Sequence, residues 1–222
     1  MSSYFLAIDQ GTTSSRVVLY NIKFKIIDIV QKEFKQYFPK DGWVEHDALE
    51  IWKDVKYLIS YIIKKNKLSS SQILSIGIAN QRETTVIWDK RTGKPINKAI
   101  VWQDRRTSKY CSKLKEKNKD KIIQKITGLI LDPYFSATKI KWILDNKNNR
   151  QYIKDNHLLF GTIDTWLLWN LTKKKSHLTD ISNASRTMLY NSQKEEWSNS
   201  LLKLFNIPKN ILPKVVENSY DF

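Results

Sequence analysis

The stretch "FLAIDQGTTSSRVVLYN", residues 5–21, decides how the rest of the chain is interpreted. Two apolar runs flank a turn of glycine, threonine and serine, so the pattern predicts two strands joined as a hairpin. Gly11 can take a positive φ and lets the backbone approach a ligand closely. The turn is either an ordinary surface hairpin, in which polar residues are common, or a loop that holds phosphate. Spacing alone favours neither interpretation.

The turn region carries side chains suited to phosphate and to a metal ion. Thr12, Thr13 and Ser14 supply hydroxyls and successive backbone N–H groups, which can form a nest for anionic oxygens. Arg16 adds a fixed positive charge. Asp9 ends the preceding strand, and Mg²⁺ is usually held by few carboxylates beside bound phosphates. The loop follows neither the Walker pattern nor the glycine-rich dinucleotide fingerprint.

The composition is typical of a globular cytoplasmic protein. The chain has 222 residues, of which 41% are hydrophobic, and this is enough to bury a sizeable core. The best candidate for a membrane span, "YLISYII" at residues 57–63, is far too short, and the N-terminus has no signal-peptide pattern. The single cysteine, Cys111, excludes an internal disulfide and argues against a cysteine-based zinc site. We therefore expect a cytoplasmic location and no membrane span.

The net charge of +16 does not indicate a nucleic-acid-binding protein. Lysine, isoleucine and asparagine abound while arginine, glycine and alanine are scarce, a bias that an AT-rich genome produces without selection for binding. The lysine runs lack interleaved aromatic residues and are typical of solvated surfaces. We therefore expect no nucleic-acid partner.

Arginine is informative against this lysine-rich background. Only seven of the 38 basic residues are arginines, and a retained arginine can mark a position that needs a rigid bidentate fork. Five of them fall in segments that carry polar motifs: Arg16, Arg82, Arg105, Arg106 and Arg186.

The pattern of elements predicts an α/β fold whose first strands are connected by hairpins. Residues 4–9, 16–21 and 25–35 are expected to be strands, and Asp47 with Glu50 forms a capping-box signature that opens a long helix. The expected buried face of this helix consists of Trp52, Val55, Leu58, Ile59, Ile62 and Ile63. Further strands are predicted in "ILSIGIAN", "TTVIWD" and "AIVW". Helices are then predicted in "SATKIKWILDN", in "TIDTWLLWNL" and in "SNSLLKLFN", which Pro208 stops, after a single lysine-rich surface helix. A short helix or a turn is predicted in "SNASRTMLYN".

Two polar segments follow predicted strands and could hold a small polyol. "ANQRETT" sets Arg82 beside Glu83, so that a guanidinium can donate to one hydroxyl while a carboxylate accepts from another. "VWQDRRT" sets Trp102, an apolar wall, next to polar groups, as small-molecule pockets require. Tyr134 adds a ring with a hydroxyl just before a predicted helix. The alternatives are an exposed salt-bridged loop and plain core packing.

Taken together, the motifs resemble the N-terminal half of the glycerol kinases, which belong to the FGGY carbohydrate kinase family. Seven motifs occur in the family's order and cover nearly all of residues 4–213: "AIDQGTTSSR", "GWVEHD", "ANQRETT", "VWQDRR", "PYFSATKIKW", "TIDTWLLWNLT" and "TDISNASRTMLYN". Each motif alone is weak, whereas seven in order are specific. The "NQRET" segment resembles glycerol kinases more than relatives that phosphorylate pentuloses or hexonates.

The resemblance implies a fold, a reaction and a set of site residues. The implied fold is an α/β, actin-like ATPase (ribonuclease-H-like) domain with a mixed sheet and flanking helices, with residues 1–222 as the N-terminal of two domains. The implied reaction is phosphorylation of glycerol to sn-glycerol 3-phosphate by ATP with Mg²⁺. The resemblance assigns the nucleotide phosphates to Thr12, Thr13, Ser14 and Arg16, the metal to Asp9, and glycerol to Arg82, Glu83, Trp102 and Tyr134.

The chain also departs from the family pattern. Ala48 and Ala137 replace a usual proline and a frequent glycine, away from the implied chemistry. The family's second domain, which carries the general-base aspartate and the adenine pocket, has no counterpart in these residues. Little or no activity is therefore expected of the chain alone.

Three interpretations follow. In the first, the chain is the N-terminal part of a glycerol kinase, and the full-length enzyme is expected to form homo-oligomers. In the second, the chain is an inactive remnant that binds glycerol or phosphate. In the third, it is a half-enzyme completed by a separately encoded C-terminal domain.

Overall fold

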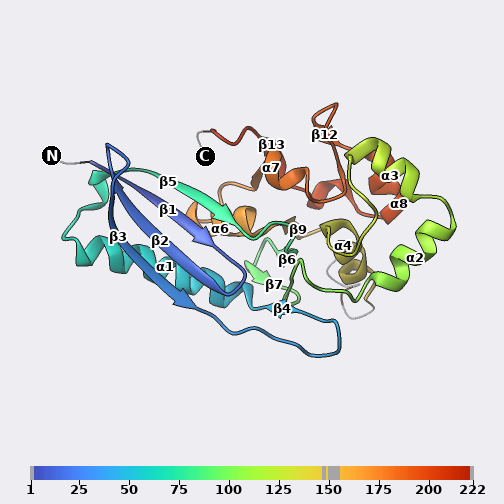
Figure 1. The fold of residues 1–222 in the computed structure, drawn as a ribbon, viewed down its shortest axis with the longest axis horizontal. Coiled ribbons are helices and arrows are strands. Elements are labelled where there is room, and N and C mark those ends of the chain that lie inside the picture. Colours follow the sequence, from blue (N-terminus) through green and yellow to red (C-terminus); the bar gives the residue numbers. More distant parts are fainter. Residues whose placement is uncertain (1–2, 147–148, 150–155, 221–222) are drawn as a thin grey trace. The chain divides into compact units, whose positions relative to one another are not determined.

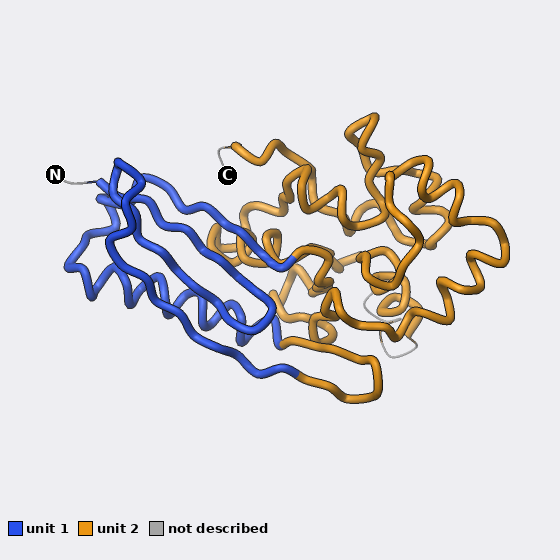
Figure 2. Tube along the Cα trace, viewed as in Figure 1, with its two compact units in different colours: residues 1–36, 47–81 blue, residues 37–46, 82–222 orange. Residues whose placement is uncertain are grey.

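The computed structural model describes residues 3–146, 149 and 156–220. It divides the chain into two compact units, which Figure 2 shows in different colours. The first unit contains residues 1–36 and 47–81, and the second contains residues 37–46 and 82–222.

The first unit is a four-stranded mixed sheet with a long helix along it (Figure 1). The strands lie in the order β3-β2-β1-β5, with bounds β1 (Tyr4–Gln10), β2 (Ser14–Asn21), β3 (Ile26–Glu33) and β5 (Ile73–Asn80). The first three strands are antiparallel neighbours, whereas β5 runs parallel to β1. Helix α1 (Ala48–Lys65) and the 3₁₀ turn η1 (Ser70–Gln72) lie between β3 and β5 in the chain, as a parallel strand pair requires. The four strands predicted here are confirmed.

Side-chain alternation sets the face of the sheet that α1 covers. Leu6 and Ile8 pair with Leu19 and Val17, and all four side chains are buried. Helix α1 contacts β2 and β3 and buries Ile51, Val55, Leu58 and Ile62. Each fully buried aliphatic side chain of this kind contributes about 1.5–3 kcal/mol through removal from water.

Helix α1 begins where the sequence predicts, but its buried face is rotated from the predicted one. The Asp47 side chain accepts hydrogen bonds from the backbone N–H groups of Leu49 and Glu50. Asp54 is buried and Trp52 only partly so, contrary to the apolar periodicity. The physical reason is an ion pair, because Lys32 of β3 reaches the Asp54 carboxylate at 2.5 Å.

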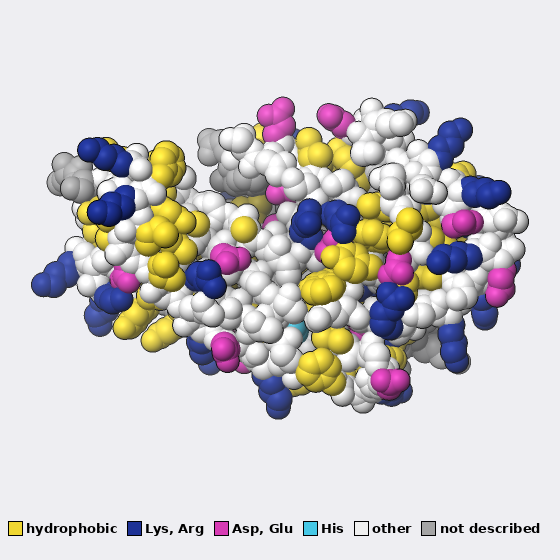
Figure 3. All heavy atoms as spheres, in the orientation of Figure 1, with side chains coloured by type: hydrophobic (Ala, Val, Ile, Leu, Met, Phe, Trp, Pro, Cys, Tyr) yellow, Lys and Arg dark blue, Asp and Glu magenta, His cyan; other side chains and the backbone are white. Residues whose placement is uncertain are grey.

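Apolar side chains remain exposed over the sheet of the first unit, and Figure 3 shows part of this apolar surface. Phe24, in the turn between β2 and β3, stacks on Phe5 with ring centroids 5.4 Å apart. The large exposed side chains of these strands and turns are Ile22, Phe24, Ile26, Ile27, Ile29, Leu74 and Ile76. Much of the apolar content of β3 and β5 thus stays at the surface.

The second unit contains several small sheets. The strand predicted in "TTVIWD" is β6, and it belongs to the sheet β7-β6-β9 rather than extending the first sheet. The remaining pairs are β4 with β8, β10 with β13, and β11 with β12. The bounds are β4 (Glu45–His46), β6 (Val86–Asp89), β7 (Lys94–Pro95), β8 (Ala99–Ile100), β9 (Leu158–Gly161), β10 (Leu178–Asp180), β11 (Tyr190–Asn191), β12 (Glu196–Trp197) and β13 (Lys214–Val216).

Helices fill the rest of the second unit, with bounds α2 (Ser108–Glu116), α3 (Asp120–Thr127), α4 (Ser136–Asp145), α6 (Ile163–Leu171), α7 (Ile181–Ala184), α8 (Asn199–Phe205) and the 3₁₀ turn η3 (Lys209–Ile211). The predicted single lysine-rich helix is wrong, because the chain turns between α2 and α3 with Asn118 at a φ of 53°. Helix α8 ends before Pro208, where Asn206 caps it in the left-handed conformation at a φ of 53°.

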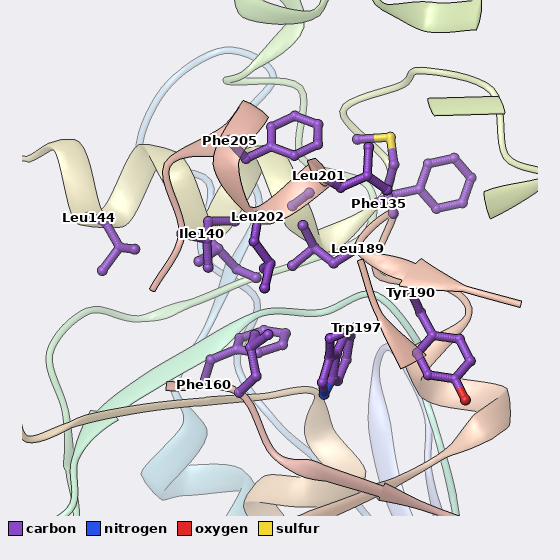
Figure 4. Packing of buried hydrophobic residues seen from close by; sticks show 14 of the residues in the cluster. Phe135, Ile140, Leu144, Phe160, Leu189, Tyr190, Trp197, Leu201, Leu202 and Phe205 are labelled. Carbon is purple, nitrogen blue, oxygen red and sulfur yellow. The ribbon is translucent and has the colours of Figure 1, made fainter. Parts of the chain in front are cut away.

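The core of the second unit holds α4 against β9 and α8. Figure 4 shows Ile140 and Leu144 of α4, Phe160 of β9 and Leu202 of α8 within one apolar cluster. This packing fixes the position of α4, whose first turn carries polar residues discussed below. Within the described residues, no helix has both the length and the hydropathy needed to cross a bilayer.

Candidate functional site

The predicted phosphate loop is a tight turn between β1 and β2 in the first unit. The backbone N–H of Gly11 donates to the Ser14 carbonyl at 2.9 Å, and the Thr13 carbonyl accepts from the backbone N–H of Phe34 at 3.3 Å. Thr13 is exposed, and Thr12 and Ser14 are partly exposed. Gly11 is not among the residues with a positive φ, so the turn does not use that freedom of glycine.

Asp9 and Arg16 face one another across the antiparallel pair β1–β2. Register places them as direct partners, and Arg16 Nη1 lies 3.8 Å from Asp9 Oδ2. Both side chains are about half exposed, so the pair contributes little to stability. The pairing instead places one cation and one carboxylate beside the same turn.

Gln31 of β3 holds two of the predicted phosphate ligands. Its side-chain oxygen accepts from Arg16 Nε at 3.0 Å, and its Nε2 donates to the Ser14 hydroxyl at 3.1 Å. Register makes Gln31 the direct partner of Arg16. Gln31 is not recognisable as a site residue in the sequence, since nothing local distinguishes it from other exposed polar residues of a strand.

Two glutamines fix the base of the turn. The backbone N–H of Gln81 donates to the Gln10 carbonyl at 2.7 Å, and the two side chains meet at 3.0 Å. Both side-chain amides donate to the Gly11 carbonyl, at 2.8 Å from Gln10 and 3.0 Å from Gln81. Gln10 is fully buried, so this contact holds the ends of β1 and β5 and the turn as one piece.

The residues of the turn fit a Mg²⁺ ion that is held mainly by phosphate oxygens. Asp9 is exposed at the carboxyl end of β1, and its side chain is the one carboxylate of this turn. In the described part of the chain, no cluster of three or more histidine, cysteine, aspartate or glutamate side chains could bind a metal by itself. One carboxylate plus nucleotide phosphates is the usual donor set for Mg²⁺.

The predicted polyol residues all lie in the second unit, and Glu83 is the most constrained of them. It is buried and has a φ of 63°, which is unusual for a residue with a side chain. Its carbonyl accepts from the hydroxyls of Ser136, at 3.0 Å, and Thr85, at 3.2 Å. Arg82 is exposed, and its carbonyl accepts from the backbone N–H of Thr84 at 2.7 Å.

Arg186 binds the Glu83 carboxylate. Its Nε donates to Glu83 Oε1 at 2.6 Å, and its side chain is 28% exposed against 3% for Glu83. The guanidinium carbon lies 5.5 Å from the ring centroid of Tyr134 and 5.0 Å from that of Phe135, within cation–π range. A carboxylate and a guanidinium thus sit beside an aromatic wall.

Tyr134 also packs against Trp102, and these two rings form the aromatic wall of the candidate polyol site. Their ring centroids lie 5.4 Å apart at 56°, and both residues are partly exposed. The backbone of Tyr134 is held by Asp132, whose carboxylate accepts from its N–H at 2.8 Å, and by Lys139 Nζ, which donates to its carbonyl. The Tyr134 backbone is therefore held on both sides, and both rings keep an accessible surface.

Lys139, which donates to the Tyr134 carbonyl, has a fully buried side chain. Burial lowers its pKa from 10.5 to about 7, while the negative charges of Glu83, Asp104 and Asp132 act in the opposite direction. Lys139 is not recognisable as a site residue in the sequence, because lysines are abundant throughout the chain. Arg186, by contrast, is distinguishable in the sequence as one of few arginines in a lysine-rich chain, although the sequence predicts no specific role for it.

The structure therefore groups the predicted residues in two sets. In the first unit, Thr12, Thr13, Ser14, Arg16 and Asp9 all belong to the β1–β2 turn or its flanking strands. In the second unit, Glu83, Trp102 and Tyr134 come together with Arg186, and Arg82 precedes Glu83 in the same loop. The first set combines hydroxyls with a guanidinium and a carboxylate, and the second combines a carboxylate with guanidinium groups and aromatic rings.

Comparison with known proteins shows which family the chain resembles. Residues 4–222 match the model of the FGGY family of carbohydrate kinases, N-terminal domain. The crystal structure of Plasmodium falciparum glycerol kinase with ADP is similar, with a TM-score of 0.91 and 39% identity, covering 96% of this chain and 43% of that one.

Two other kinases share the fold at lower identity. A gluconate kinase from Lactobacillus acidophilus has a TM-score of 0.87 and 24% identity, covering 97% of this chain and 42% of that one. A xylulose kinase from the same organism has a TM-score of 0.86 and 24% identity, covering 96% and 42%. The chain thus spans less than half the length of each of these relatives.

Proposed function

The chain belongs to the FGGY family of carbohydrate kinases and has an α/β, actin-like ATPase fold, and we propose that it forms the N-terminal part of a glycerol kinase. The proposed reaction transfers the terminal phosphoryl group of ATP to glycerol and gives sn-glycerol 3-phosphate and ADP. The observation that carries the proposal is the cluster of Glu83, Arg186, Trp102 and Tyr134 in the second unit. The higher identity to a glycerol kinase than to a gluconate or a xylulose kinase, 39% against 24%, supports the substrate.

The proposed polyol site matches the chemistry of glycerol, a small neutral triol. The Glu83 carboxylate accepts a hydrogen bond from one hydroxyl, and the exposed Arg82 guanidinium donates to another. The rings of Trp102 and Tyr134 cover the carbon chain and exclude water from it. Fixed polar groups beside an apolar wall select a ligand with hydroxyls at a defined spacing.

The proposed nucleotide site is the β1–β2 turn. The hydroxyls of Thr12, Thr13 and Ser14 and the Arg16 guanidinium bind the phosphates of ATP, and Gln31 keeps Arg16 and Ser14 oriented toward them. Asp9 would hold Mg²⁺, which neutralises phosphate charge when bound. Phosphoryl transfer depends mainly on positioning the reactants and stabilising charge. The residues of this chain contribute to the reaction by binding and orienting the phosphates.

We assign the general base to the family's second domain, as the resemblance implies. The chain then acts with that domain, either in one longer polypeptide or as a half-enzyme with a separately encoded partner. Loss of a catalytic base commonly lowers the rate by about two to four orders of magnitude, so the 222-residue chain alone is expected to have little activity.

The test is glycerol-dependent ADP formation by the purified chain with ATP and Mg²⁺, before and after addition of the C-terminal domain of a glycerol kinase. Activity that appears only with the added domain, and that Arg82→Ala abolishes, supports the proposal. Equal or better activity with xylulose or gluconate would overturn the substrate assignment. Glycerol binding without activity in any combination would favour an inactive remnant.

A further inference from the structure

Glu83 presents a buried carboxylate that a guanidinium neutralises. Its side chain is 3% exposed, and Arg186 Nε lies 2.6 Å from Oε1. A carboxylate buried without a cation is strongly unfavourable, and one partner lost from such a pair leaves an uncompensated charge. The guanidinium therefore offsets part of the cost of burying the Glu83 carboxylate.

The geometry of Arg186 is fixed on two sides. Its guanidinium carbon lies 5.5 Å from the ring centroid of Tyr134 and 5.0 Å from that of Phe135. Its Nε–H donates a hydrogen bond to the Glu83 carboxylate. Among the described residues, no hydrogen bond from its Nη atoms is present, and the side chain is 28% exposed. The guanidinium thus borders solvent-accessible space beside a ring proposed to cover glycerol.

The backbone of Glu83 has an unusual, left-handed conformation. A φ of 63° in a residue with a side chain persists only where the surroundings enforce it, and such strain is concentrated at binding and catalytic sites. The hydroxyls of Ser136 and Thr85 hold the Glu83 carbonyl, and Arg186 holds the carboxylate. Both ends of the residue are held in one orientation.

We propose that Arg186 is a positioning residue of the polyol site, which holds the Glu83 carboxylate in the orientation that accepts a substrate hydroxyl. This role rests on the proposed function, since it needs a polyol at Glu83. The competing interpretation is a structural ion pair that stabilises the fold and leaves polyol affinity unchanged.

The two interpretations differ for a lysine substitution. Lysine keeps the positive charge but lacks the planar fork and the flat contact with aromatic rings. If Arg186 is a positioning residue, we expect Arg186→Lys to lose part of the affinity for glycerol and Arg186→Ala to lose about tenfold or more of it. If the role of Arg186 is purely structural, we expect both variants to bind glycerol as the unchanged chain does.

The experiment is an NMR titration of the 222-residue chain with glycerol, alongside thermal unfolding of each variant. Arg91→Ala is the matched control, because Arg91 also forms an ion pair with a buried carboxylate, that of Asp89, at 2.8 Å. Arg82→Ala reports on the polyol site itself. The expected result is weaker binding for Arg186→Ala, an intermediate affinity for Arg186→Lys, and unchanged binding for Arg91→Ala.

The possible failures are distinct. Glycerol binding that Arg82→Ala abolishes and Arg186→Ala leaves intact overturns the role of Arg186 alone. Equal losses in Arg186→Ala and Arg91→Ala overturn it too, because a general loss of stability then explains both. No binding by the unchanged chain overturns the proposed polyol site and the role of Arg186 with it.

Discussion

Arg186 donates from Nε to Glu83 Oε1 across 2.6 Å, although the two residues are 103 positions apart in the sequence. The contact joins the loop before β6 to the segment after α7, and it brings a guanidinium to a carboxylate beside the ring of Tyr134. The candidate polyol site is therefore a product of long-range packing as much as of its local motif.

Glu83→Gln should abolish most glycerol binding while the fold persists. An amide keeps the size of the side chain but loses the negative charge that pairs with Arg186 and that makes Glu83 a strong acceptor for a substrate hydroxyl. Since Arg186 is partly exposed, water can solvate its guanidinium in the variant. NMR titration with glycerol and a thermal melt measure the two effects separately. A variant that binds glycerol like the unchanged chain would contradict the role of Glu83.

Arg82→Ala should lower glycerol affinity with little change in stability. The Arg82 side chain is exposed and makes no hydrogen bond within the described residues, so its removal should change the free energy of unfolding by about 0.5 kcal/mol or less. Urea unfolding and glycerol titration test this directly. A large loss of stability would show that Arg82 has a structural role instead.

Gln31→Ala should weaken ATP binding by about fivefold or less, as expected when one neutral hydrogen-bonded side chain is lost. Gln31 fixes Arg16 at 3.0 Å and the Ser14 hydroxyl at 3.1 Å without belonging to the turn itself. Arg16→Ala, which removes a proposed phosphate ligand, should have the larger effect. Titration with a fluorescent ATP analogue compares the two variants. Unchanged ATP affinity in Gln31→Ala would contradict the bridging role of Gln31.

Lys139→Met should change how stability depends on pH above neutrality. Burial lowers the Lys139 pKa from 10.5 to about 7, so between these values the unfolded chain holds a proton that the folded chain lacks. Lys139 therefore makes stability rise with pH in this window, by the order of 1 kcal/mol per pH unit. Urea unfolding at pH 7, 8 and 9 should show a steeper rise for the unchanged chain than for the variant. Parallel curves would show that Lys139 is not titrating.

His177→Gln should reduce the loss of stability in acid. Burial lowers the His177 pKa from 6.5 to about 4, so the unfolded chain binds a proton between these values that the folded chain excludes. Stability from the neutral ring is present above about pH 6.5 and is lost as the pH falls toward 4. His46, whose pKa is also lowered to about 4, acts in the same direction and remains in the variant.

Asp164 opposes this trend, because burial raises its pKa to about 6, and its protonation favours the folded chain as the pH falls from 6 toward 3.8. The test is the difference in unfolding free energy between pH 7 and pH 5. It should be smaller for His177→Gln than for the unchanged chain. The variant should also be less stable at pH 7, since His177 packs on the ring of Trp88 with centroids 5.6 Å apart.

The sequence determined the local features of this protein. Alternating apolar residues specify the strands β1, β2, β3 and β5, and Asp47 specifies the start of α1, because side-chain periodicity and capping act within a few residues. The motif order from residue 4 onward also indicated the kinase family, and the family model confirms it.

The tertiary structure decided which of these segments meet. It assigned β6 to a second sheet, placed Asp54 inside through Lys32, and brought Gln31, Lys139 and Arg186 to the candidate sites. None of these contacts follows from periodicity, because they join residues far apart in the chain and depend on strand register and helix packing. The sequence named Glu83 as a polyol ligand, and only the folded chain shows the arginine that pairs with its carboxylate.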